Sequence, residues 1–134
     1  MVSLVIISHS AKIAEGVKEM ADQMTGGAVP IVSCGGFEGG LGTDEERIRA
    51  GIQAVYSPDG VLILLDLGSA VLTAESVLET LSDSEREKIA IADAPLLEGA
   101  LFSSVEASIG SPLSKVKEVA EQAAFFRKLE TGNS

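Results

Sequence analysis

The only histidine of the chain, His9, directly follows a short apolar segment, and Asp66 ends a second one. A neutral imidazole is a nucleophile that is available at neutral pH. A carboxylate that accepts one ring N–H would orient the imidazole and stabilise the cation formed when the other nitrogen reacts. The two residues therefore indicate nucleophilic chemistry at His9 with Asp66 as its partner.

Both residues also have ordinary structural interpretations. A single histidine is more often a surface or core group, and Asp66 occupies the place of a helix cap at a strand end. The position of His9 between Ser8 and Ser10, at a junction of strand and helix, favours chemistry. A phosphoryl group at such a junction would meet backbone N–H groups and the positive end of a helix dipole.

Three further residues are candidates for binding that phosphoryl group. Gly68 and Ser69 open the segment after Asp66, and Ser10 follows His9. Ser69 equally suits a helix N-cap, and Ser10, like Ser8, equally suits local hydrogen bonding within a turn.

The segment 34–42 is dense in glycine, reading Cys-Gly-Gly-Phe-Glu-Gly-Gly-Leu-Gly. It has neither the G-x-x-x-x-G-K-[ST] nor the G-x-G-x-x-G spacing and lacks a lysine, so it does not predict a nucleotide cradle. We interpret it as a mobile loop or docking rim, and Cys34 as a small buried apolar residue. The docking candidates are Gly35, Gly36, Phe37, Gly39 and Gly40.

Composition narrows the possible functions. The 134 residues carry a net charge of −10, which argues against a nucleic-acid partner because no basic surface is available to neutralise phosphates. One cysteine and one histidine predict neither an internal disulfide nor a metal site. No apolar run approaches the ~18 residues of a membrane span, and the N-terminus lacks a signal peptide's basic region, so we expect a cytoplasmic protein without membrane contact.

Apolar segments alternate with amphipathic ones along the chain, which predicts strands alternating with helices. The helices are expected over 11–24, from a capping box at 43–46, over 67–81, over 95–107 and from Pro112 onward. The expected strands are Val2–Ile7, Val29–Ser33, Val61–Leu65 and Lys88–Ala92.

Helical spacing also predicts which side chains face the core. For the first helix these are Ile13, Val17, Met20 and Met24. For the last helix they are Val116, Val119, Ala120, Ala123 and Phe126.

The alternation predicts an α/β fold with an open, mainly parallel sheet and helices on both faces. We expect the strand order 2-1-3-4, by analogy with flavodoxin-like sheets. Ligands of such sheets bind beyond the carboxyl ends of the strands, where the strand order switches. In this order the first and third strands are neighbours, so His9 and Asp66 would face each other at the switch point. We expect one domain over 1–129 and a frayed tail over 130–134.

The segments Ile7–Gly16 and Leu64–Ala70, with the glycine-rich Gly35–Thr43, resemble the phosphotransferase (M) subunit of phosphoenolpyruvate-dependent dihydroxyacetone kinase. That subunit is similar to the mannose-family enzyme IIA domain of the sugar phosphotransferase system. The mannose-type enzymes have a longer segment after the aspartate. The compact Leu67–Ala70 therefore favours the dihydroxyacetone system.

The resemblance implies that His9 is phosphorylated by the phosphocarrier HPr, with Nε2 as the reacting nitrogen, and that Asp66 is its acidic partner. The phosphoryl group would pass to ADP on the kinase L subunit, which would also hold the Mg²⁺; no cofactor is expected in this chain. A homodimer is implied as well. Because the chain ends at Ser134 without an HPr-like domain, we expect a separate donor protein.

Two other functions are compatible with the same residues. One is a sugar-specific enzyme IIA, which would pass the phosphoryl group to a IIB domain. The other is a regulatory module that docks a partner without turnover. Flavin or nucleotide binding would rest on the topology alone.

Overall fold

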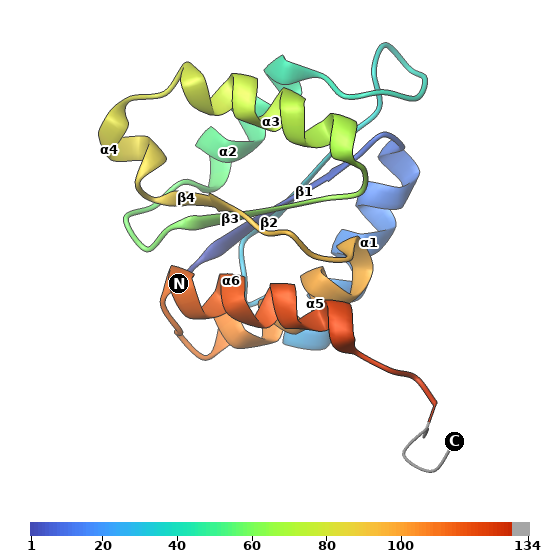
Figure 1. Cartoon of the computed structure of the whole chain (residues 1–134), viewed down its shortest axis with the longest axis vertical. Coiled ribbons are helices and arrows are strands. Elements are labelled where there is room, and N and C mark those ends of the chain that lie inside the picture. The colour runs from blue at the N-terminus through green and yellow to red at the C-terminus, as the bar shows by residue number, and fades with distance from the viewer. Residues whose placement is uncertain (130–134) are drawn as a thin grey trace.

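Four parallel strands form the centre of the protein in a computed structural model that describes residues 1–129 (Figure 1). Their order, β2-β1-β3-β4, confirms the predicted sheet. The predicted frayed tail, 130–134, lies outside the described residues. The strands are β1 (Ser3–Ser8), β2 (Ile31–Gly35), β3 (Val61–Leu65) and β4 (Ile89–Ile91).

The register of the central strands sets the position of the site. Ile7 of β1 lies beside Leu65 of β3, and Ser8 lies beside Gly35 of β2. Because β1 and β3 pair in parallel with this register, both strands end at the same edge of the sheet. Every residue of the two strands is buried up to that edge. His9 and Asp66 are the first residues beyond that edge.

Helices cover both faces of the sheet, as predicted (Figure 1). The helical elements are α1 (Ala11–Thr25), α2 (Glu45–Val55), α3 (Gly68–Glu79), α4 (Asp83–Arg86), α5 (Leu96–Ser108), α6 (Leu113–Gln122) and the 3-10 turn η1 (Ala123–Phe125). Helices α1, α5 and α6 pack on one face, and α2 and α3 on the other. Within residues 1–129, no helix has both the length and the apolar character of a membrane span.

The prediction for the buried face of α1 was largely wrong. Val17 is buried, but Ile13, Met20 and Met24 are about half exposed. The buried stripe is instead Ala14, Val17 and Ala21, whose small side chains allow the helix to lie close to the sheet and to α5. Periodicity identified the helix, but the larger apolar side chains were assigned to the wrong face.

Two helix boundaries also differ from the predictions. The capping box expected at Thr43 is absent, because Asp44 caps α2 by accepting the N–H groups of Glu46 and Arg47. A capping box forms instead between Ser82 and Glu85, and it opens the short helix α4, which was not predicted.

The second strand and the C-terminal helix show smaller deviations. β2 begins at Ile31, after Pro30, whose carbonyl accepts the N–H of Leu4. Phe126 lies beyond the end of α6 and is half exposed, so its predicted place on the inner face was wrong. It packs edge-to-face on Phe102, with 5.1 Å between ring centroids.

Glycines allow the loop after β2 to lie against the start of α1. A Cβ at Gly35 would stand 2.6 Å from the carbonyl oxygen of Ser10 and 2.7 Å from the Cα of Ala11. Gly36 has a φ of +80°, which side chains rarely permit. The next residues form a tight turn in which Phe37 and Gly40 exchange two backbone hydrogen bonds. The glycines therefore serve close backbone packing beside His9.

This packing predicts opposite effects of alanine at two glycines. Gly35→Ala should destabilise the protein by roughly 1–3 kcal/mol, because its Cβ would collide with backbone that cannot rotate away. Gly16→Ala, in the exposed interior of α1 with open space around it, should stabilise by about 0.5–1 kcal/mol. Urea unfolding curves measure both changes, and equal midpoints for the two variants would contradict the close approach.

Candidate functional site

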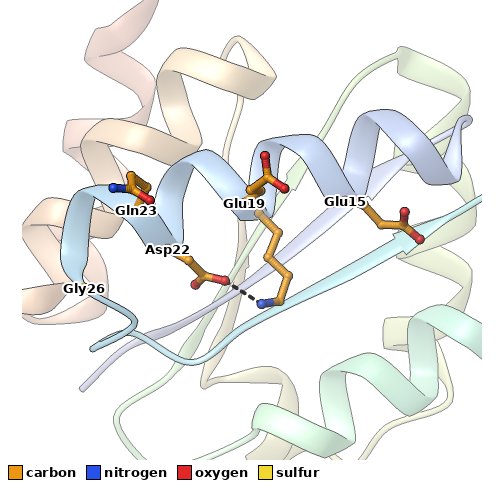
Figure 2. Close-up of a pocket in the computed structure, with 6 residues that line it drawn as sticks. Glu15, Glu19, Asp22, Gln23 and Gly26 are labelled. Atoms are coloured by element: carbon orange, nitrogen blue, oxygen red, sulfur yellow. Dashed lines mark hydrogen bonds and ion pairs between the residues drawn. The ribbon is translucent and has the colours of Figure 1, made fainter.

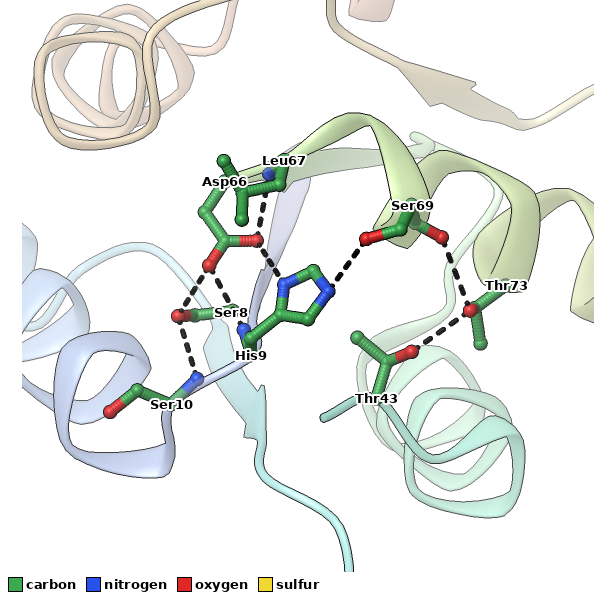
Figure 3. A network of polar contacts seen from close by, with 8 residues as sticks. All are labelled: Ser8, His9, Ser10, Thr43, Asp66, Leu67, Ser69 and Thr73. Carbon is green, nitrogen blue, oxygen red and sulfur yellow. Dashed lines mark hydrogen bonds and ion pairs between the residues drawn. The ribbon is translucent and has the colours of Figure 1, made fainter. Parts of the chain in front are cut away.

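The carboxylate of Asp66 is the centre of the polar network at the edge of the sheet (Figure 3). Its Oδ2 accepts the hydroxyl of Ser8 and the backbone N–H of His9, both at 2.9 Å. Its Oδ1 accepts Nδ1–H of His9 at 2.9 Å and the N–H of Leu67 at 2.8 Å. Four donors thus occupy the acceptor positions of one carboxylate, which holds it in one orientation.

These contacts determine the tautomer of His9. A carboxylate only accepts hydrogen bonds, so Nδ1 carries a proton, and in the neutral imidazole Nε2 then holds the lone pair. The hydroxyl of Ser69 lies 2.7 Å from Nε2 and donates to it. About a quarter of the His9 side chain is exposed. The imidazole is therefore anchored through one nitrogen while the other stays reachable from solvent.

Asp66 is ionised in this arrangement. Burial raises the pKa of its carboxyl, but the hydrogen bonds from the backbone and ring of His9 and from Ser8 lower it by more. The net result is a pKa below the usual value of 3.8. An ionised Asp66 can balance the charge of an imidazolium that forms at His9.

Three predicted phosphoryl-binding residues occupy different positions. Ser69 is not an N-cap: Leu67 holds that place without a side-chain bond, and Ser69 is the second residue of α3. Gly68 is the first residue of the same helix, so the N–H groups of both lie in the first turn, where helices leave donors unused. Ser10 caps α1 by accepting the N–H of Ile13 at 3.3 Å, so its hydroxyl serves the helix.

The glycine-rich loop contacts the site through its backbone. The N–H of Gly42 donates to the carbonyl of His9 at 2.8 Å. Phe37 is 46% exposed and Leu41 is 81% exposed, so the tip of the loop presents apolar surface to solvent. The predicted docking role of this loop stays a prediction.

Two threonines near His9 were missed as functional candidates. The hydroxyls of Thr43 and Thr73 lie 2.9 Å apart, and Thr73 donates to the carbonyl of Ser69 at 3.4 Å. Thr73 follows Ser69 by four residues, and side chains at that spacing share one face of a helix. That spacing was the available signal for Thr73, whereas Thr43 was assigned to a cap.

Other features lie apart from the imidazole. Cys34 is buried, as predicted, and burial raises the pKa of its thiol to about 11.

An open pocket of about 550 Å³ lies along α1, where Lys18 pairs with Asp22 at 2.6 Å (Figure 2). None of the predicted site residues lines it.

The chain is thus an α/β protein with a carboxylate-oriented histidine at the switch point of a parallel sheet. Comparison with known proteins identifies its family. Residues 3–117 match the EIIA-man family, described as the PTS system fructose IIA component.

Curated relatives of this chain belong to one group within that family. The chain is 43% identical over 110 residues to "PEP-dependent dihydroxyacetone kinase 2, phosphoryl donor subunit DhaM" of Listeria innocua, covering 81% of this chain and 88% of that protein. It is 39% identical over 136 residues to the phosphoryl donor subunit DhaM of Pantoea ananatis, covering 98% of this chain. The chain spans only 29% of the length of the Pantoea protein.

A solved structure has the same fold. EF1359, a protein of unknown function, superimposes with a TM-score of 0.80 at 34% identity, covering 90% of this chain and 93% of that one. The chain therefore belongs to the EIIA-man family and, within it, to the DhaM phosphoryl donor subunits of PEP-dependent dihydroxyacetone kinase.

The lowered pKa of Asp66 predicts how stability depends on pH. A group whose pKa is lower in the folded state stabilises the fold above its unfolded pKa, and this contribution is lost as pH falls through the folded pKa. Asp66→Asn should therefore be less stable than the native chain by about 1–2 kcal/mol at pH 7. This gap in the free energy of unfolding between Asp66→Asn and the native chain should narrow as the pH falls below 3.8.

Urea unfolding from pH 7 to pH 3 measures this gap. Asp93→Asn is the matched control, because Asp93 is exposed and follows β4 at the same edge of the sheet. A gap for Asp66→Asn that is unchanged across the range would contradict the assignment of a stabilising, ionised carboxylate.

Proposed function

We propose that this chain is a phosphocarrier in which Nε2 of His9 accepts a phosphoryl group from phospho-HPr and passes it to ADP on the kinase L subunit. The observation that carries the proposal is the His9–Asp66 pair, which leaves Nε2 unprotonated and exposed beside the N-terminus of α3. The relatives named as phosphoryl donor subunits support the same direction of transfer.

The first step is an in-line displacement at phosphorus. The lone pair of Nε2 forms the new N–P bond while the N–P bond to the donor histidine breaks, and the donor ring keeps the released electron pair. His9 gains positive charge as the bond forms, and Asp66 stabilises that charge through Nδ1–H. In the second step a terminal oxygen of ADP forms a bond to the phosphorus while the Nε2–P bond breaks. Nε2 keeps the released electron pair, and the His9 imidazole becomes neutral again.

The start of α3 supplies donors for the transferred group. Ser69 donates to Nε2 in the resting protein, so its hydroxyl must turn from the nitrogen to a phosphoryl oxygen as the N–P bond forms. The N–H groups of Gly68 and Ser69 lie in the first turn of α3, at the positive end of the helix dipole, where an anion is favoured. These fixed dipoles would stabilise the transition state without reorganising.

Apolar side chains around His9 are suited to docking both partners. Ile13, Phe37, Leu41 and Leu67 come from three segments that border the site, and each is at least 46% exposed. The net charge of −10 would favour partners with basic surfaces, since charge complementarity speeds encounter. Raised salt should then slow transfer.

The remaining expectations belong to the same proposal. The ADP and its Mg²⁺ would be held by the L subunit, so this chain would need no cofactor of its own. A cytoplasmic location follows from the proposed partners. The homodimer rests on the family resemblance, and sedimentation velocity over a range of concentrations measures it.

Phosphorylation of His9 is the direct test. Incubation with radiolabelled phosphoenolpyruvate, enzyme I and HPr should place an acid-labile label on the protein, and His9→Ala should carry none. A label on His9→Ala, or none on the native chain, would refute the proposal. Adding either the L subunit with ADP or a IIB domain then identifies the acceptor, and transfer only to the IIB domain would favour a sugar-specific enzyme.

Removing the hydroxyl of Ser69 should slow transfer without unfolding the protein. Ser69→Ala loses one hydrogen bond to a charged group, which corresponds to roughly a 10- to 100-fold lower rate. Ser114→Ala is the matched control, because Ser114 is the second residue of α6 as Ser69 is of α3. Single-turnover labelling measures both rates, and equal rates would rule out a role for the Ser69 hydroxyl.

A further inference from the structure

A circuit of hydrogen bonds, joined by short covalent links, begins at the imidazole of His9 and ends at the His9 carbonyl. Figure 3 shows the side chains that belong to it, Ser69, Thr73 and Thr43. From Nε2 the circuit runs to the hydroxyl of Ser69 at 2.7 Å, and from the carbonyl of Ser69 to the hydroxyl of Thr73 at 3.4 Å. Thr73 contacts the hydroxyl of Thr43 at 2.9 Å. The neighbouring Gly42 returns to His9 by donating its N–H to the His9 carbonyl at 2.8 Å.

The circuit joins three segments that are far apart in the chain. His9 lies between β1 and α1, Thr43 lies at the end of the glycine-rich loop, and Thr73 belongs to α3. The Thr43–Thr73 hydrogen bond is the side-chain contact in this circuit that connects the loop to the helix carrying Ser69. Both ends of the circuit reach His9, one at the ring and one at the backbone.

The direction of each hydrogen bond follows from the donors available. A threonine hydroxyl has one proton, and that of Thr73 is used on the Ser69 carbonyl. Thr43 must therefore donate to Thr73. Both threonines are partly buried and their β-branched side chains have few rotamers, so the pair is stiff.

We propose that Thr43 and Thr73 are positioning residues, which hold the glycine-rich loop against the first turn of α3 and thereby keep the Ser69 hydroxyl on Nε2 of His9. Neither touches the imidazole. They act through Ser69, and the proposal rests on the proposed phosphoryl transfer at His9. Displacing the first turn of α3 would move the Ser69 hydroxyl and the N–H groups of Gly68 and Ser69 together.

Isosteric substitution tests the pair. Thr73→Val keeps the shape but loses both hydrogen bonds, and it should lower the single-turnover transfer rate roughly 3- to 10-fold, as expected for one net hydrogen bond. Thr73→Ser restores the hydroxyl and should recover most of the rate. Thr25→Val is the matched control, because Thr25 donates to the carbonyl of Ala21 four residues earlier, at the C-terminal end of α1.

A double-mutant cycle shows whether Thr43 and Thr73 act on the transfer rate as a pair or independently of each other. Thr43→Val combined with Thr73→Val should cost little more than Thr73→Val alone, because Thr73→Val already breaks the contact between the two hydroxyls. The apparent KM for phospho-HPr should stay within about twofold, since the apolar docking side chains are unchanged. Losses that simply multiply, or failure of Thr73→Ser to recover the rate, would overturn the proposal.

A spectroscopic readout distinguishes this proposal from the phosphoryl transfer on which it rests. The ¹⁵N chemical shift of Nε2 in unphosphorylated protein reports the Ser69 hydrogen bond directly, and it should move in Thr73→Val but not in Thr25→Val. If the native chain takes no phosphate, the proposed function fails whatever the shift does. If it takes phosphate, and Thr73→Val matches it in rate and shift, the positioning role alone is wrong.

Discussion

The site depends on the hydrogen bonds that the carboxylate of Asp66 accepts. Its four hydrogen bonds come from Ser8, from the backbone and ring of His9, and from Leu67, so it ties the ends of β1 and β3 to the imidazole. The same bonds keep the carboxyl ionised against the effect of burial. An ionised, immobile acceptor places the proton of the neutral imidazole on Nδ1, and Nε2 keeps the lone pair.

Asp66 can accept hydrogen bonds from His9 because of how the parallel strands β1 and β3 pair. The register sets Ile7 beside Leu65, so the next residue of each strand, Ser8 and Asp66, meets at the point where the sheet ends. A shift by one residue would exchange the side chains packed in the two cores, and close-packed cores tolerate such changes of shape poorly. The packing of the whole domain therefore fixes the distance between His9 and Asp66.

Topology explains why His9 and Asp66 could be predicted from sequence while other features could not. Alternating apolar segments predicted a parallel α/β sheet, and the strand order was taken from flavodoxin-like sheets. That order brings these two residues together without any knowledge of side-chain contacts. The face of α1 was misjudged because alanines form the buried stripe, and small residues contribute little to a hydrophobic pattern. Thr43 and Thr73 escaped prediction because their contact depends on how a loop folds back on a helix.

The glycine-rich loop illustrates how one composition can serve two kinds of site. In a nucleotide cradle, glycines let backbone N–H groups approach phosphate oxygens. In this protein the approach is directed at the protein itself: Gly35 lies against the start of α1, and Gly42 donates to the carbonyl of His9. The close contacts of the loop thus hold the backbone of the histidine in place. A carrier that passes a phosphoryl group on has more use for a well-placed nucleophile than for a tight phosphate grip, because every added ground-state contact would slow release.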